Sequence, residues 1–194
     1  ADAAVTVEII SDFVCPWCRT LEEAHGQTLA AKAKAGEIRL VIHPVVNSVL
    51  ADLNDHYSQR ALLAVETVAA LEPDKFWAFY EALWANQPEE SKTGKDLTDA
   101  AIGDLAASVG VTDATIERFT DSPVAEWAEW SSDEASKRAS GTPVAYLSFD
   151  GSEPQVWNGW LLSGTDADGQ EVYAPGDLDK AIANVKAGKA PDDE

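Results

Sequence analysis

The sequence predicts a mixed α/β fold in which a β-α-β unit and a β-β-α unit flank a block of four or five helices. Three observations predict this class. Segments rich in β-branched residues lie near both ends of the chain, and segments with helical spacing of apolar residues lie between them. A Cys-Pro-Trp-Cys segment stands where the first strand passes into the first helix. At 194 residues the chain is long enough for one well-cored domain, or for a domain with an insertion.

The first strand is predicted at residues 5–10, which are β-branched and partly alternating. The segment 16–35 is rich in Ala, Leu, Glu and Lys and predicts a helix that Gly36 ends. This helix begins with a proline, which a helix tolerates in its first turn. Residues 38–42 predict a second strand. The order strand, helix, strand implies a parallel pair, and it places the two cysteines at the strand-to-helix junction.

The middle of the chain, from about residue 55 to about residue 140, predicts four or five helices from apolar residues at helical spacing. Thr98 and Thr112 are the predicted N-caps of two of them. One of these segments carries a stripe of aromatic side chains, which we interpret as helix–helix core and not as a ligand site. The stripe consists of Phe76, Trp77, Tyr80 and Trp84.

The last part of the chain returns to strand character. Residues 144–149 predict a strand, and Asp150-Gly151 is a hairpin turn signal. We expect the return strand within residues 155–162. A short final helix is predicted from about residue 177 to about residue 187, ended by Gly188.

The composition is that of an acidic globular protein, with 34 acidic and 14 basic residues and a formal net charge of −20. This charge disfavours nucleic acids and anionic lipids as partners, because both would be repelled. No apolar run approaches the roughly 18 residues that a membrane span requires. The chain has no Met and opens without an apolar leader, so we expect it to be a processed piece of a longer precursor.

The chain has only two cysteines, Cys15 and Cys18. A disulfide-stabilised scaffold would need more cysteines, in wider loops. A structural zinc site would need four ligands, and His25, His43 and His56 lack the usual paired spacing. We therefore expect no metal and predict redox chemistry.

A Cys-x-x-Cys pair at a helix N-terminus has the properties that disulfide exchange requires. The first-turn N–H groups and the helix dipole stabilise negative charge, so the first cysteine ionises easily. The second cysteine lies one turn further along and resolves the mixed disulfide that the first forms with a substrate. We therefore predict Cys15 as the exposed nucleophile and Cys18 as the more buried resolving thiol. Inert core cysteines, or half of a zinc knuckle, are the structural alternatives.

Several segments together resemble the DsbA-like proteins of the thioredoxin superfamily, in particular exported proteins of actinobacteria and other Gram-positive bacteria. The segments that carry the resemblance are 11–18, 57–61, 76–88 and 141–143. The resemblance implies a thioredoxin fold with an inserted helical block. Residues 1–54 and 140–194 would form the thioredoxin-fold domain, and residues 55–139 the helical insertion domain.

The resemblance also implies a substrate groove beside the cysteines. In this family the bond that corresponds to Thr142–Pro143 is cis and faces the disulfide; a cis bond costs little before proline and is retained for its shape. The backbone of Thr142 would lie beside Cys15, where an extended substrate strand can pair with it. Pro16 and Trp17 of the motif are expected to border the same groove.

Two positions depart from the family pattern. Trp17 stands where strongly oxidising relatives carry His, and Trp cannot supply the positive charge of a protonated His. Many relatives bury an acid six residues before the first cysteine, as a proton relay for the resolving thiol, and here that position is Ile9. Asp12 and Glu8 are the candidates to replace it, although strand alternation places Glu8 on the face opposite Ile9.

The leading hypothesis is an extracytoplasmic oxidase, secreted or membrane-anchored, that introduces disulfides into reduced or unfolded secreted proteins. We expect a monomer with no cofactor besides the redox-active disulfide of Cys15 and Cys18, re-oxidised by a membrane partner. A reductase or isomerase of the same fold, or a cytoplasmic FrnE-like oxidoreductase, is an alternative enzyme. A non-catalytic binding module with surface tryptophans, such as Trp157 and Trp160, is the alternative of another class.

Overall fold

The structure is a computed structural model that describes residues 3–89, 97–139, 144–157, 159–165 and 171–193. The chain divides into two compact units. The first comprises Ala1–Ile10, Thr20–Ile42 and Pro143–Glu194, and the second comprises Ser11–Arg19 and His43–Thr142. The predicted domains, with boundaries at residues 54 and 140, stay a prediction.

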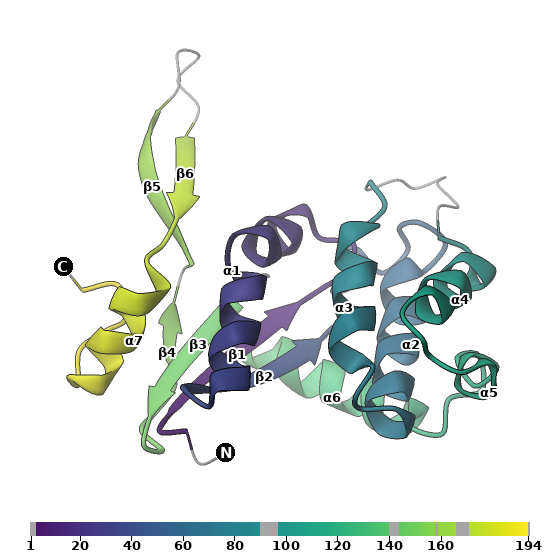
Figure 1. Cartoon of the computed structure of the whole chain (residues 1–194). Helices are drawn as coiled ribbons and strands as arrows, with labels where there is room; N and C mark the ends of the chain where they lie inside the picture. The colour runs from purple at the N-terminus through teal and green to yellow at the C-terminus, as the bar shows by residue number, and fades with distance from the viewer. Residues whose placement is uncertain (1–2, 90–96, 140–143, 158, 166–170, 194) are drawn as a thin grey trace. The chain divides into compact units, whose positions relative to one another are not determined.

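The first unit is built on a four-stranded sheet with the strand order β2-β1-β3-β4 (Figure 1). Its elements are β1 (Val5–Ser11), α1 (Pro16–Ala35), β2 (Ile38–Pro44), β3 (Val144–Phe149), β4 (Gln155–Trp157) and α7 (Leu178–Lys186), where β1, α1 and β2 each extend by a few residues into the second unit. β1 pairs with β3 in the antiparallel direction, with Val7 opposite Leu147, and β3 pairs likewise with β4. The predicted β-α-β order at the N-terminal end is confirmed, whereas two further strands precede the final helix at the C-terminal end.

The core of the first unit lies where apolar side chains of the sheet meet those of α1 and α7. Alternation in β1 sends Val5, Val7 and Ile9 into this core. The buried members from the other elements are Leu21, Leu29, Ile38, Ala145, Leu147, Trp157, Leu178, Ala181, Ile182 and Val185. Trp157 is 2% exposed, so it belongs to the core and not to a binding surface.

The prediction of a return strand within residues 155–162 holds only for residues 155–157 and is wrong for the rest. β4 ends at Trp157, and the chain turns at Gly159, which has a φ of +62° that favours glycine. Strands β5 (Trp160–Thr165) and β6 (Glu171–Pro175) form a separate two-stranded sheet. The turn is fixed by Gly159 O, which accepts a hydrogen bond from Gly176 N at 2.8 Å and lies 3.0 Å from His25 Nε2.

The second unit contains the five helices of the predicted helical block (Figure 1). They are α2 (Tyr57–Leu71), α3 (Phe76–Ala85), α4 (Asp99–Ser108), α5 (Asp113–Ile116) and α6 (Ala125–Arg138). Thr98 caps α4 as predicted, because its side chain accepts a hydrogen bond from Ala101 N. Thr112 precedes α5 but makes no side-chain cap, since its hydroxyl donates to Glu72 Oε1 at 2.7 Å instead.

No helix in the described ranges is long and apolar enough to cross a membrane.

Candidate active site around Cys15 and Cys18

The segment between β1 and α1 is a tight turn that carries the first cysteine to the start of the helix. Cys15 N donates to Asp12 O at 3.0 Å, and Val14 N donates to the Asp12 side chain at 2.8 Å. A short side chain that accepts from the N–H two residues on is the usual reason for Asp in such turns. α1 begins at Pro16, as predicted, so Cys15 stands at the mouth of the helix and Cys18 lies in its first turn.

Both cysteines are free thiols and both are buried, Cys15 with 5% and Cys18 with 1% of its surface exposed. The predicted order of accessibility is therefore confirmed, but the description of Cys15 as exposed is wrong. Burial follows from the turn, which folds the apolar residues Phe13 and Val14 inward beside the cysteine, each of them 1% exposed.

The surroundings of Cys15 stabilise its thiolate. The pKa of Cys15 is lowered from 9.0 to about 7, chiefly by a hydrogen bond from the Cys18 side chain. Burial acts in the opposite direction, and the backbone N–H groups of Cys18 and Trp17 add to the lowering. These N–H groups belong to the first turn of α1, where helical N–H groups have no intrahelical partner.

The surroundings of Cys18 keep its thiol protonated. Burial, above all, raises its pKa well above 9.0, and the hydrogen bond to Cys15 raises it further. The backbone N–H of Asp12 donates to Cys18 Sγ at 3.4 Å and opposes this shift only in part. The two thiols therefore differ in the way a nucleophile and a resolving thiol differ.

Asp12 is fully buried, and its carboxylate is saturated with donors. It accepts hydrogen bonds from Val14 N at 2.8 Å, from Asn47 N at 2.7 Å and from the Ser58 hydroxyl at 2.5 Å. Donors to a carboxylate favour its charged form. The negative charge in turn raises the pKa of both cysteines. This geometry fits a fixed anion better than the predicted proton relay, which stays a prediction.

Gln87, just beyond the end of α3, holds the other side of the turn. Its Nε2 donates to Phe13 O at 2.9 Å and to Cys15 O at 3.0 Å, and the residue is 9% exposed. The side-chain amide of Gln87 therefore donates both of its hydrogens to the backbone that carries Cys15. Gln87 fixes the position of Cys15 relative to the helical unit.

Aromatic side chains of α3 form the apolar wall behind the turn. The Phe13 ring lies 4.9 Å from the Trp84 ring and 5.8 Å from the Tyr80 ring, measured between centroids. Tyr80 also stacks on Phe76 at 5.7 Å and contacts Trp77 at 5.2 Å. Tyr80 and Trp84 are buried core as predicted and support the cysteine turn, whereas Phe76 and Trp77 are half-buried.

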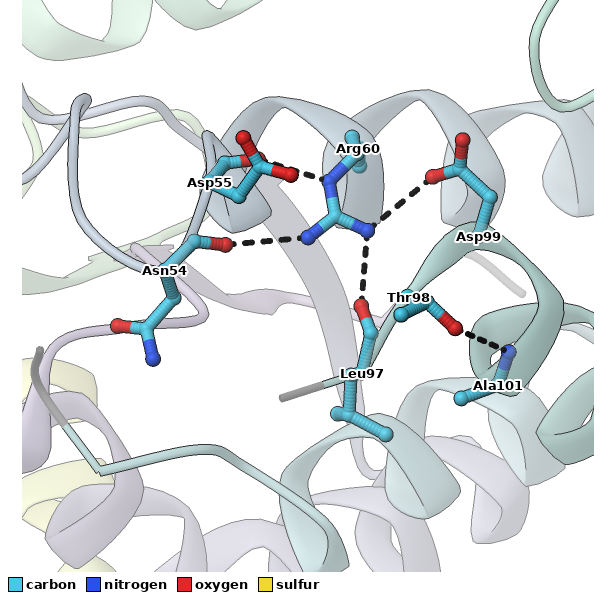
Figure 2. Close-up of polar contacts among 7 residues, drawn as sticks. All are labelled: Asn54, Asp55, Arg60, Leu97, Thr98, Asp99 and Ala101. Carbon is cyan, nitrogen blue, oxygen red and sulfur yellow. Dashed lines mark hydrogen bonds and ion pairs between the residues drawn. The ribbon is translucent and has the colours of Figure 1, made fainter. Parts of the chain in front are cut away.

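The start of α2, which carries Ser58, is held by an unusual loop. Asn54, Asp55 and His56 all have positive φ, at 51°, 57° and 60°. Asn, Asp and His are the non-glycine residues that tolerate this conformation best. Arg60 compensates by donating to Asn54 O at 3.1 Å and to Asp55 O at 3.0 Å (Figure 2).

The same guanidinium also reaches the segment before α4. It donates to Leu97 O at 2.8 Å and to Asp99 Oδ1 at 3.1 Å (Figure 2). Leu97 has a φ of 52°, so Arg60 donates hydrogen bonds to carbonyls at two places where the backbone is left-handed. A partly buried Arg with its donors in a fixed fork suits this role better than Lys would. Arg60 thereby fixes the end of α2 that presents Ser58 to Asp12.

The structure brings most of the predicted site residues together in the second unit. Asp12, Cys15 and Cys18 share one hydrogen-bonded turn, and Pro16 and Trp17 are exposed beside it, Trp17 by 56%. The predicted groove residues Thr142 and Pro143 lie outside the described residues. Glu8 is half-buried in β1, on the face opposite Val7 and Ile9, and belongs to the first unit.

Sequence reasoning missed three residues of the site, namely Asn47, Ser58 and Gln87. Each contacts the turn from 35 to 74 positions away along the chain. No local pattern marks such contacts, because they depend on how the helices pack. Within the described ranges, no group of three or more His, Cys, Asp and Glu side chains is placed to hold a metal ion. The expected absence of a metal stays a prediction.

Gln87→Leu should loosen the turn that carries Cys15. It leaves two carbonyls without their amide donor, and we expect the free energy of unfolding to fall by about 1–3 kcal/mol. We also expect slower alkylation of Cys15 at pH 8, since the thiolate is no longer held in one place. Asn86→Leu is the matched control, because the Asn86 side chain is exposed and bonds only to Ala82 O of its own helix. Equal effects of the two changes would contradict the role given to Gln87.

Comparisons with known proteins agree with this geometry. Residues 1–147 match the thioredoxin family. The chain is 30% identical over 108 residues to disulfide bond formation protein D of Bacillus subtilis. That match covers 55% of this chain and 45% of the other protein, so it spans less than half the length of that relative.

Solved structures extend the likeness over most of the chain. Oxidised BdbD from Bacillus subtilis is 27% identical, with a TM-score of 0.66, and the match covers 81% of this chain and 80% of that chain. Oxidised DsbA from Mycobacterium tuberculosis is 25% identical, also with a TM-score of 0.66, and covers 80% of this chain and 76% of that chain. With a Cys-x-x-Cys pair at the head of α1 and a family match over residues 1–147, the chain belongs to the thioredoxin family and has a DsbA-like thioredoxin fold.

Proposed function

We propose that the protein is a thiol–disulfide oxidoreductase that introduces disulfides into secreted proteins through Cys15 and Cys18. The observation that carries the proposal is the contrast between the two thiols. The pKa of Cys15 is lowered to about 7, and that of Cys18 is raised well above its ordinary value. Such a pair offers one thiolate near neutral pH and keeps a protonated thiol directly behind it.

The reaction begins with the disulfide between Cys15 and Cys18. A substrate thiolate attacks Cys15 Sγ, the new sulfur–sulfur bond forms, and the bond between the two cysteines breaks. Cys18 leaves with the electron pair and takes up a proton, which its raised pKa favours. A second substrate thiolate then attacks the substrate sulfur of the mixed disulfide and releases Cys15 as a thiolate. The substrate loses two electrons and gains a disulfide, and the cysteine pair gains the two electrons.

The substrates we propose are reduced or unfolded proteins outside the cytoplasm. The names of two relatives, a disulfide bond formation protein and a DsbA, support this choice. The exposed Trp17 offers an apolar contact beside the nucleophile for an unfolded chain. Each turnover leaves the pair reduced, so an oxidant must restore the disulfide, and we propose a membrane-bound one.

A reductase is the second candidate, and one observation favours it. The Asp12 charge raises the pKa of both cysteines, so it disfavours the thiolate of the reduced pair and makes the pair less oxidising. Trp17 also supplies no positive charge that would offset this effect. The hydrogen bond from the Cys18 side chain and the backbone N–H groups favour the thiolate, and the Asp12 charge opposes them.

The test is oxidative refolding of a reduced, unfolded protein that needs several disulfides. We expect the oxidised protein to form disulfides in this substrate stoichiometrically within minutes, and catalytically when oxidised glutathione is added. The same protein should reduce insulin slowly with dithiothreitol. Fast insulin reduction with no transfer of disulfides to the unfolded substrate would make it a reductase. Inactivity in both assays would favour the non-catalytic binding module.

A further inference from the structure

The backbone of Asp12 is hydrogen-bonded to both cysteines of the pair. Its backbone N–H donates to Cys18 Sγ at 3.4 Å, and its backbone carbonyl accepts from Cys15 N at 3.0 Å. These two bonds place the buried side chain close to the thiols while turning it toward the helical block. The residue is 0% exposed, so water screens its charge very little.

The surroundings of the carboxylate favour its charged form. Two backbone N–H groups and one hydroxyl donate to it, at 2.5–2.8 Å. Hydrogen bonds of this kind stabilise a carboxylate, and a buried anion acts on neighbouring charges.

We propose that Asp12 is a positioning residue whose buried negative charge opposes the Cys15 thiolate and thereby limits how strongly oxidising the cysteine pair is. The inference rests on the proposed function and deepens it. Two glutathione thiols reduce the disulfide and become oxidised glutathione. The cysteine pair gains two electrons, and after one proton is released it carries a thiolate at Cys15 and a thiol at Cys18. A fixed like charge nearby raises the free energy of that product and leaves the uncharged disulfide unaffected.

The Asp12 side chain has two separable roles in this scheme, one as a hydrogen-bond acceptor and one as a charge. The turn needs the Asp12 side chain as an acceptor for Val14 N, which a neutral side chain can also provide. The charge itself is not needed for that bond. Neutral replacements that still accept from Val14 N therefore separate the effect of charge from the effect of shape.

Asp12→Asn and Asp12→Ser are two such replacements. If one of these variants does not fold, the other can still be measured. Each is equilibrated with glutathione at pH 8, above the Cys15 pKa of about 7, where the reduced pair carries its thiolate. We expect the equilibrium constant to shift roughly three- to tenfold toward the reduced protein, which makes the pair more oxidising. The pH of half-maximal Cys15 alkylation should fall in the same variants.

Ser58→Ala is the matched control, because it breaks the same network and keeps the charge. It should lower the stability of the protein and leave the glutathione equilibrium within about twofold of wild type. Equal shifts in Ser58→Ala and Asp12→Asn would show that Asp12 acts through structure alone and would overturn the inference. So would neutral variants with an unchanged or less oxidising pair. A wild-type protein that does not exchange with glutathione at all would instead overturn the proposed function.

Discussion

Cys15→Ser should reduce disulfide transfer to the rate of the uncatalysed reaction, whereas Cys18→Ser should accumulate mixed disulfides. The reason is the division of roles: without Cys15 no accessible thiolate remains, and without Cys18 the mixed disulfide that Cys15 forms by attacking a substrate disulfide has no neighbouring thiol to release it. Non-reducing electrophoresis after incubation with an unfolded disulfide-rich protein measures both results. Mixed disulfides that form through Cys18 in the Cys15→Ser variant would contradict the assignment of the nucleophile.

The roles can also be separated by alkylation. Limiting iodoacetamide should label Cys15 of the reduced wild type first, with a half-maximal rate near pH 7. The Cys18 side chain is the largest cause of the lowered Cys15 pKa. Cys18→Ala should therefore move the midpoint toward 9.0, and Cys18→Ser, which keeps a donor, should move it less. Preferential labelling of Cys18 in the wild type would contradict the scheme.

The second large effect concerns the stability of the two redox forms, and its sign follows from linkage. The Cys15 pKa is lower in the folded protein, about 7, than its ordinary value of 9.0. The folded reduced form therefore gains stability that is complete above pH 9 and is lost as the pH falls through 7. The oxidised form has no thiol to titrate. The stability of the reduced form relative to the oxidised form should rise with pH.

The size of this effect can be stated for two pH values. Between pH 6 and pH 8.5 we expect the difference in unfolding free energy to change by about 2 kcal/mol in favour of the reduced form. At pH 7 the Cys15 thiolate should contribute only a few tenths of a kcal/mol to this difference in unfolding free energy. Cys18, whose pKa is raised, has the opposite effect, and this begins to matter only as the pH approaches 9. Denaturant titrations of both redox forms across this range provide the measurement.

The contacts around Cys15 bear on the direction of the reaction. We expect the reduced form to be the more stable one at pH 7, as for an oxidase. At that pH the thiolate contributes only a few tenths of a kcal/mol to this preference. A pH-independent stability difference would show that thiolate stabilisation does not set the direction of the reaction.

Much of the fold follows from local patterns. The β-branched alternation of β1 and the Gly36 stop of α1 have local causes, and both are where the sequence predicts them. Helices α2, α3 and α4 follow from apolar spacing in the same way, whereas the four-residue α5 has no such pattern. The hairpin of β5 and β6 was missed because an apolar run through Trp160 looks like a continuing strand, whereas a backbone turn at Gly159 ends it.

The sequence by itself determined the redox pair, its place at the head of a helix and the order of its two thiols. Those features depend on neighbours within a few residues, where Cys spacing and helix N–H groups act. Only the tertiary structure decided what surrounds the pair: Ser58 and Asn47 on the Asp12 carboxylate, and Gln87 on the Cys15 carbonyl. These bonds join residues more than 30 positions apart, so they exist only after the helices of the second unit have packed.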